Sequence, residues 1–115
     1  FNMWIFTPFG FFSIVHKTYD APEQLTIRAR VRGDLENLVS HLPSASAIRE
    51  DIAADYRFRI TAEKDDVAYL MARLVVDLDY DNFKNQVAKE QGYDRAACYG
   101  EVWSTLYELQ STEAA

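Results

Sequence analysis

The stretch LTIRARVR (residues 25–32) alternates strictly between apolar and polar side chains. A period of two places the apolar side chains on one face of an extended chain and the polar ones on the other, which is typical of a half-buried β-strand. The same alternation returns over residues 56–60, where Arg57 and Arg59 alternate with apolar side chains. We therefore predict two strands that each turn an apolar face to a core and an arginine face away from it.

Each of these strands is followed by apolar residues at helical spacing. After the first strand, Asp34 is a candidate helix N-cap, and apolar residues recur every three or four positions until Pro43 ends the helix. After the second strand, a clear apolar stripe runs over residues 67–78. Two further helical segments follow, separated near Gly92. Residues 43–54 fit either a short helix or a connecting loop.

The first residues of the chain are aromatic and favour β-structure. Residues 4–7 and 11–17 are separated by Pro8-Phe9-Gly10, and a proline and a glycine this close together indicate a turn between two strands. The pattern as a whole predicts an α+β fold, in which helices pack on a small antiparallel sheet and the C-terminal third is helical. A ferredoxin-like variant is one alternative for this arrangement.

A chain of 115 residues is long enough for one domain, and its hydrophobic content of 49% excludes a disordered segment. We expect a single domain over residues 3–110, a remnant of an expression vector at residues 1–2 and a frayed tail at residues 111–115. No apolar run approaches the ~20 residues that cross a bilayer, so no membrane partner is expected. With the single cysteine Cys98 and no recognisable secretory leader, we expect a cytoplasmic protein.

Three stretches resemble a group of small, uncharacterised bacterial proteins. They are residues 3–13 (MWIFTPFGFFS), residues 79–84 (DYDNFK) and residues 99–103 (YGEVW). Together they extend over most of the chain. The resemblance implies a bacterial, cytoplasmic origin, and it brings no activity, cofactor or ligand with it, because no function is known for the group.

Five of the twelve basic residues lie on the polar faces of the two predicted strands. They are Arg28, Arg30, Arg32, Arg57 and Arg59. If the strands pair, these arginines form a cationic strip, and arginine beside aromatic side chains on an open sheet is how several proteins bind single-stranded nucleic acid. A nucleic acid or another anionic ligand is therefore one predicted partner. The alternative is a solvated sheet face, or arginines that form ion pairs with nearby carboxylates.

The net charge of −6 disfavours an anionic partner as a bulk property, but this charge is unevenly distributed. Before Gly33, four basic residues stand against two acidic ones, whereas from Gly33 onward eight basic residues stand against sixteen acidic ones. The strands concentrate arginine, and the helical portion carries the acidic surplus. An anionic partner is therefore limited to the sheet.

The aromatic residues at the start of the chain exceed what one buried strand face can hold. They are Trp4, Phe6, Phe9, Phe11 and Phe12. Core packing accounts for most of them, and the remainder predicts an interface with a second copy of the chain or with a larger protein. Our main hypothesis is accordingly a non-catalytic interaction protein that forms a homodimer or serves as an accessory subunit.

No arrangement typical of catalysis or of metal binding is recognisable in the sequence. The two histidines, His16 and His41, lack further ligands at metal-binding spacing. The acidic run at residues 77–82 resembles the start of a calcium loop, but Asn82 and Ala88 stand where such a loop needs Gly and Glu. We predict no catalytic residue, no metal and no cofactor. A small cofactor-free enzyme with a pocket between sheet and helices is the remaining alternative.

Overall fold

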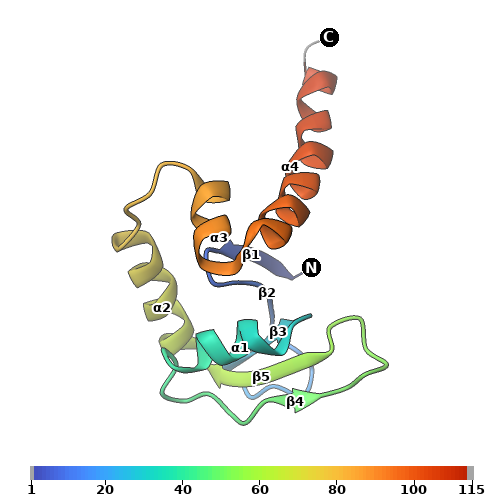
Figure 1. Cartoon of the computed structure of the whole chain (residues 1–115). Coiled ribbons are helices and arrows are strands. Elements are labelled where there is room, and N and C mark those ends of the chain that lie inside the picture. Colours follow the sequence, from blue (N-terminus) through green and yellow to red (C-terminus); the bar gives the residue numbers. More distant parts are fainter. Residues whose placement is uncertain (1, 114–115) are drawn as a thin grey trace. The chain divides into compact units, whose positions relative to one another are not determined.

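The computed structural model describes residues 2–113, and the chain forms two compact units with the division after Leu78 (Figure 1). We expected one domain over residues 3–110, and this range includes residues of both units. The last helix continues through Glu113, so part of the expected frayed tail is helical, and the rest of that tail lies outside the described residues. The expected vector remnant at residues 1–2 also falls partly outside them.

The first unit contains a five-stranded antiparallel sheet. Its strands are β1 (Met3–Thr7), β2 (Gly10–Val15), β3 (Gln24–Ala29), β4 (Arg49–Glu50) and β5 (Phe58–Glu63). Their order across the sheet is β1-β2-β3-β5-β4, which confirms the predicted antiparallel sheet. Along the chain, three strands, a helix, two strands and a helix follow one another, which is not the order of the ferredoxin-like alternative.

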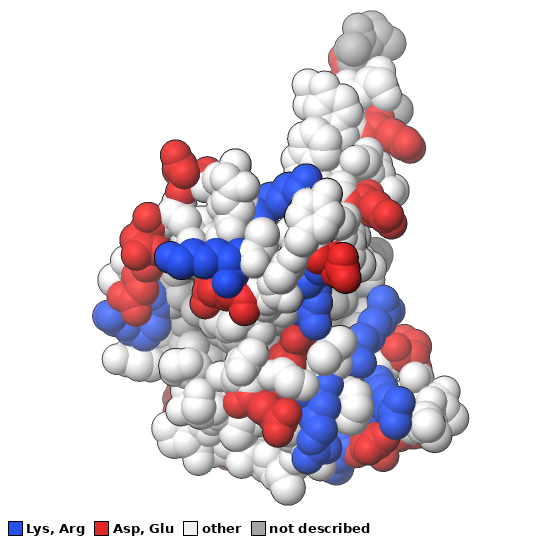
Figure 2. Space-filling model, in the orientation of Figure 1, with Lys and Arg blue, Asp and Glu red and all other residues white. Residues whose placement is uncertain are grey.

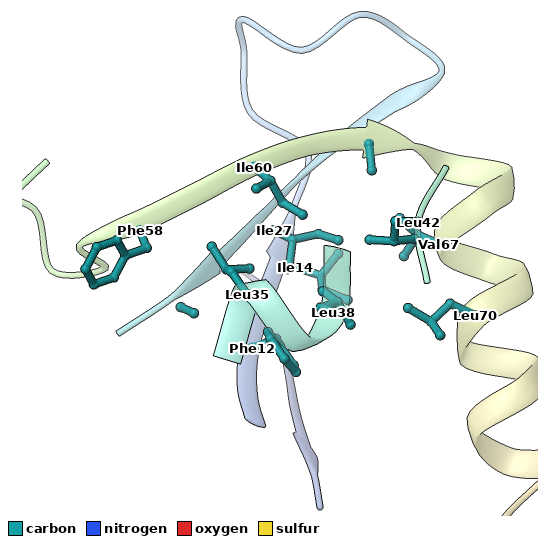
Figure 3. Packing of buried hydrophobic residues seen from close by; sticks show 12 residues of the cluster. Phe12, Ile14, Ile27, Leu35, Leu38, Leu42, Phe58, Ile60, Val67 and Leu70 are labelled. Atoms are coloured by element: carbon teal, nitrogen blue, oxygen red, sulfur yellow. The ribbon is translucent and has the colours of Figure 1, made fainter. Parts of the chain in front are cut away.

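Two helices, α1 (Arg32–Val39) and α2 (Lys64–Val76), pack on the apolar face of this sheet. Ile27 of β3 and Ile60 of β5 stand opposite each other in the strand register, and both are fully buried. Leu35 of α1 is buried in the same cluster, which also takes side chains from α2 (Figure 3). The apolar halves of the two alternating stretches therefore build the core, as predicted.

Helix α1 begins earlier than the sequence predicted. Val31 occupies the N-cap position and Asp34 lies in the first turn, so the predicted capping role of Asp34 is wrong. Asp34 is buried, and its Oδ2 accepts a hydrogen bond from the backbone N–H of Phe11 at 3.0 Å. Its carboxylate thus ties α1 to strand β2, and the early helix start removes Arg32 from the strand that the sequence predicted.

The segment between α1 and β5 forms no helix, and serine side chains attach part of it to β5. Ser44 Oγ accepts a hydrogen bond from the N–H of Glu63 at 2.9 Å, and Ser46 Oγ accepts one from the N–H of Thr61 at 2.9 Å. The N–H of Ser46 donates in turn to the carbonyl of Thr61 at 2.9 Å. These bonds hold the segment alongside β5 until the short strand β4 pairs with it.

The second unit consists of α3 (Phe83–Gln91) and α4 (Tyr93–Glu113), joined at Gly92. The side chain of Asn82 caps α3, because it accepts a hydrogen bond from the N–H of Asn85 at 3.0 Å. Gly92 has a φ of 98°, which residues with a side chain rarely adopt, so this tight connection favours glycine. In the described part of the chain, no helix is both long and apolar enough to cross a membrane.

Gly10 begins β2 at a place with no room for a side chain. A Cβ there would lie 2.7 Å from Phe12 Cζ and 2.8 Å from Asp34 Cβ. Because both neighbours are buried, we expect Gly10→Ala to lower the free energy of unfolding by about 1–3 kcal/mol in urea denaturation. The control is Gly33→Ala in α1, where nothing lies within 4 Å of the new Cβ and stability should hold or rise. Equal stabilities of the two variants would contradict the close packing at Gly10.

Candidate anion-binding face

One row of side chains crosses all five strands on the sheet face opposite α1 and α2. The strand register pairs Trp4 with Ser13, Ser13 with Arg28, Arg28 with Arg59, and Arg59 with Arg49. Residues directly opposite each other in antiparallel strands point to the same face, so the three arginines stand side by side on β3, β5 and β4. We call Arg28, Arg59 and Arg49 the arginine row, and this side of the sheet the arginine face.

Arg28 is the buried member of the row, with 5% of its surface exposed. Its Nη2 donates a hydrogen bond to Ser13 Oγ at 2.8 Å, and its Cζ lies 4.4 Å from the ring centroid of Tyr56 in a cation–π contact. Its Nε is buried and makes no hydrogen bond within residues 2–113, and no carboxylate of these residues forms an ion pair with it. A hydroxyl and an aromatic ring therefore hold this guanidinium without an acidic partner.

Arg59 and Arg49 continue the row toward the edge of the sheet at β4. Arg59 is half-buried; its Nε donates to the carbonyl of Tyr56 at 3.4 Å, and its Nη2 lies 3.8 Å from Asp55 Oδ1. Arg49 is exposed, and it donates to Ser46 Oγ at 3.2 Å and to a threonine hydroxyl at 3.1 Å. Among the described residues, Arg49 thus contacts hydroxyls and forms no ion pair, whereas Arg59 forms one long ion pair, with Asp55.

The structure brings together three of the five predicted arginines and adds Arg49. Arg28 and Arg59 stand opposite each other in the register, and the Cζ of Arg30 lies 4.6 Å from the same Tyr56 ring that Arg28 contacts. Among the described residues, neither Arg30 nor Arg49 forms an ion pair with a carboxylate. The positive charge on this face is therefore only weakly neutralised from within the protein.

The other two predicted arginines lie apart from the row. Arg57 precedes β5 and forms an ion pair with Glu50 at 2.6 Å, so the alternative of ion pairs with nearby carboxylates describes this residue. Arg32 begins α1. Figure 2 shows basic and acidic side chains interleaved over the part of the first unit where β4 and β5 lie. Arg57 and Arg32 are therefore not part of the arginine row.

The candidate interface aromatics divide between the two faces of the β1–β2 hairpin. Phe11 contacts Trp4 edge-on at 5.5 Å between ring centroids, and Phe6 stacks on Phe11 at 4.6 Å, on the arginine face. Phe12 lies in the core with 1% of its surface exposed. The ring centroid of Phe9, in the turn, lies 6.0 Å from the ring centroid of Phe12. Phe12 thus offers no surface to a partner. Trp4, in contrast, is 54% exposed and lies on the arginine face of the edge strand β1.

Sequence reasoning missed Arg49 and Tyr56 as members of this site. Arg49 lies in the segment whose structure the sequence left open, and Tyr56 was expected on the apolar face of a strand. The ring of Tyr56 is buried against two guanidinium groups instead. Alternation gave no signal for Arg49 and pointed to the opposite face for Tyr56, because the site depends on which segments become neighbours.

The pKa of Tyr19, in the connection between β2 and β3, is lowered in part by an arginine of this face. Its hydrogen bond with Thr26 lowers the pKa of its phenol below the ordinary 10.0, and Arg59 lowers it further as a hydrogen-bond partner and as a nearby positive charge. Burial and the charge of Asp20 act in the opposite direction without cancelling the effect. Thr26 and Arg59 thus both favour the charged form of the Tyr19 phenol.

We expect the phenol of Tyr19 to ionise with a pKa below the ordinary 10.0. In the variant Arg59→Gln, this pKa should rise. Because the folded pKa lies below the unfolded pKa, Tyr19 stabilises the fold above pH ~10, and this contribution is lost as the pH falls through the folded pKa. The difference in ultraviolet titration between the wild type and Tyr19→Phe isolates this phenol. Tyr80, whose pKa is raised by burial and by the charge of Glu90, should titrate later. An unchanged titration of Tyr19 in Arg59→Gln would contradict the contact.

Comparison of the chain with protein-family models, with curated proteins and with solved structures finds no match in any of the three. Within the part of the chain that the structure describes, no group of three or more His, Cys, Asp and Glu side chains is placed to hold a metal ion. The functional interpretation therefore depends on the geometry of the arginine face.

Proposed function

We propose that this chain is a binding protein that takes single-stranded nucleic acid as an anionic ligand on its arginine face. The observation that carries the proposal is Arg28, a buried guanidinium whose Nε has no hydrogen-bond partner within residues 2–113. Arg59 stands directly opposite it, and Arg49 stands directly opposite Arg59. An anion in front of this row would add negative charge beside Arg28 and Arg49, which form no ion pair with a carboxylate of the described residues.

The energetics of the row support a binding role over a purely structural one. Burying a charged side chain costs several kcal/mol unless it is well paired, and like charges directly opposite each other in a sheet cost roughly 0.2–1 kcal/mol more. A row of apolar residues at these positions would give a more stable sheet. An arrangement that lowers stability is expected where a ligand restores the charge balance.

The line of paired residues that runs from Trp4 on β1 to Arg49 on β4 favours a ligand that combines phosphates with planar rings. Trp4 and Arg49 are separated by four strand spacings of about 4.8 Å, or roughly 19 Å, which is more than one phosphate can bridge. A single nucleic-acid strand supplies phosphates to the arginines and bases that stack on Trp4, whatever their sequence. An acidic protein segment would satisfy the arginines but has no repeated rings to offer to Trp4.

The proposal is tested by fluorescence anisotropy with a labelled oligodeoxythymidine. We expect binding at low salt that weakens with a slope of about −0.7 per phosphate contact in log K against log salt, or roughly −2 for three arginines. Arg49→Gln and Arg59→Gln should each weaken binding and flatten the slope. The matched control is Arg73→Gln, because Arg73 is an exposed arginine on α2 that forms its own ion pair with Asp77.

Two outcomes of these binding measurements would contradict the proposal. If no binding occurs at low salt, or if the Arg73 control weakens binding as much as the row variants do, the proposal fails. Polyglutamate serves as the probe for an acidic protein partner, and Trp4→Ala removes the stacking platform. If polyglutamate binds as tightly as the oligonucleotide and Trp4→Ala changes neither affinity, the ligand is an acidic protein and the nucleic-acid assignment is wrong.

A further inference from the structure

Within the arginine face, we propose that Tyr56 is the positioning residue that holds Arg28 and Arg59 in the orientation in which they meet the phosphates of the ligand. This inference rests on the proposed function, because it concerns the same site. The ring centroid of Tyr56 lies 4.4 Å from Arg28 Cζ, and the carbonyl of Tyr56 accepts a hydrogen bond from Arg59 Nε at 3.4 Å. One residue therefore contacts two neighbouring members of the row.

The surroundings of the Tyr56 ring set it apart from the core. Tyr56 is 3% exposed, yet it is not a member of the apolar cluster between the sheet and its two helices. The Cζ of Arg30 lies 4.6 Å from the ring centroid, in addition to the Cζ of Arg28. At such distances the face of an aromatic ring attracts a cation. Two guanidinium groups thus contribute to the burial of this ring.

The backbone around Tyr56 is itself fixed by hydrogen bonds. The N–H of Tyr56 donates to Asp55 Oδ1 at 3.0 Å, and the carbonyl of Arg57 accepts from the N–H of Asp51 at 2.8 Å. The carbonyl of Asp55 accepts a hydrogen bond from Arg30 Nε at 3.3 Å, which ties the segment to the residue that follows β3. Tyr56 therefore offers the arginines a support that is held on both sides along the chain.

This support differs from an ion pair in its effect on charge. A carboxylate that fixes an arginine also neutralises it, whereas a tyrosine ring and a backbone carbonyl carry no net charge. Among residues 2–113, the arginine row forms one ion pair, between Arg59 and Asp55 at 3.8 Å, and the Asp55 side chain is 71% exposed. Tyr56 thus orients Arg28 without cancelling its charge. An arginine that is already oriented loses less conformational freedom when a phosphate binds to it.

A positioning role has its own signature in the salt dependence of binding. The slope of log K against log salt reflects the number of phosphates that the protein neutralises. Removal of an arginine from the row should flatten this slope, as expected for Arg59→Gln. Removal of the support leaves the number of arginines unchanged, so affinity should fall at every salt concentration while the slope stays the same. The two roles can therefore be told apart in one titration series.

The experiment measures the anisotropy of a labelled oligodeoxythymidine with Tyr56→Leu and Tyr56→Phe. Leucine removes the ring, and we expect affinity to fall about tenfold with the slope of the wild type. Phenylalanine keeps both the ring and the backbone carbonyl, so this variant should bind like the wild type. The matched control is Phe58→Leu, which removes a buried ring that lies 5.4 Å from the Cζ of Arg57, an arginine outside the row. This control should lose stability and keep its affinity.

The NMR signal of the Arg28 Nε–H gives a readout that needs neither the ligand nor the leucine variant. It is identified by its absence in Arg28→Met, and in the wild type it should be shifted by the ring current of Tyr56. The proposal is overturned if this signal has the position of a free arginine. A wild type that binds no oligonucleotide contradicts the proposed function, and a shifted signal would then still support the contact between Tyr56 and Arg28.

The binding data can also overturn the positioning role by themselves. They do so if folded Tyr56→Leu binds as the wild type does, or if it flattens the slope as Arg59→Gln does. Failure of Tyr56→Phe to restore the affinity has the same consequence. An equal loss of affinity in Phe58→Leu would show that any buried ring in this region matters as much as Tyr56.

Discussion

Phe12→Ala is expected to lower the free energy of unfolding by about 3–5 kcal/mol, the cost of removing a fully buried aromatic side chain. Phe12 has 1% of its surface exposed and belongs to the cluster between the sheet and its two helices. Its ring also lies against the position of Gly10, so the space that it leaves cannot close without movement of the hairpin. A loss of this size is a large fraction of the stability of a small domain.

The control for this prediction is Trp4→Ala on the neighbouring strand. Trp4 is larger than Phe12 but 54% exposed, so its removal should change stability by about 1 kcal/mol or less. Guanidinium denaturation of both variants, analysed with equal slopes, measures the difference. Comparable losses at the two positions would show that Trp4 is as much a part of the core as Phe12, and that it is not a surface residue available to a ligand.

Replacing Arg28 by Met, together with Ser13→Ala, is expected to raise stability and abolish ligand binding at once. The double variant removes a buried positive charge with an unpartnered Nε and the hydroxyl that would otherwise lose its partner. Replacing buried ionic groups by apolar residues of similar volume is often neutral or stabilising by about 1–4 kcal/mol. Loss of a buried charge from a ligand contact costs about 2–5 kcal/mol, so affinity for the oligonucleotide should fall about 30-fold or more.

Opposite changes in stability and affinity are the signature of a residue retained for binding. Thermal or chemical denaturation without ligand gives the first quantity, and anisotropy at low salt gives the second. Arg73→Met on α2 is the control, since it removes an exposed arginine far from the row in sequence and should leave affinity unchanged. If the Arg28 variant loses stability and binds the oligonucleotide as the wild type does, Arg28 is a structural residue and the proposed site is wrong.

Much of the fold of the first unit was predictable because it follows from local periodicity. The alternation over residues 25–32 placed Ile27 in the core and Arg28 on the opposite face, and the structure confirms both. The Pro8-Phe9-Gly10 turn between β1 and β2 was equally plain, since its residues favour a reversal of the chain wherever they occur. These features depend on neighbours within a few positions.

Two features that the sequence did not determine depend on contacts between distant parts of the chain. Asp34 was expected to cap its own helix, but its carboxylate accepts the N–H of Phe11, 23 residues away. The hydroxyls of Ser44 and Ser46 accept hydrogen bonds from backbone N–H groups of β5. These bonds hold a segment that has no apolar periodicity alongside that strand. A side chain that satisfies a distant backbone group has no local pattern for sequence reasoning to detect.

The candidate site depends both on local sequence periodicity and on contacts between distant parts of the chain. Sequence alone determined that arginines alternate with core residues on two strands, and that the aromatic start is neutral and hydrophobic. The tertiary structure decided that β5 lies between β3 and β4, which sets Arg28, Arg59 and Arg49 in one row and leaves Arg32 outside it. The physical reason is that alternation fixes the face on which a side chain lies, whereas strand pairing fixes which side chains share that face.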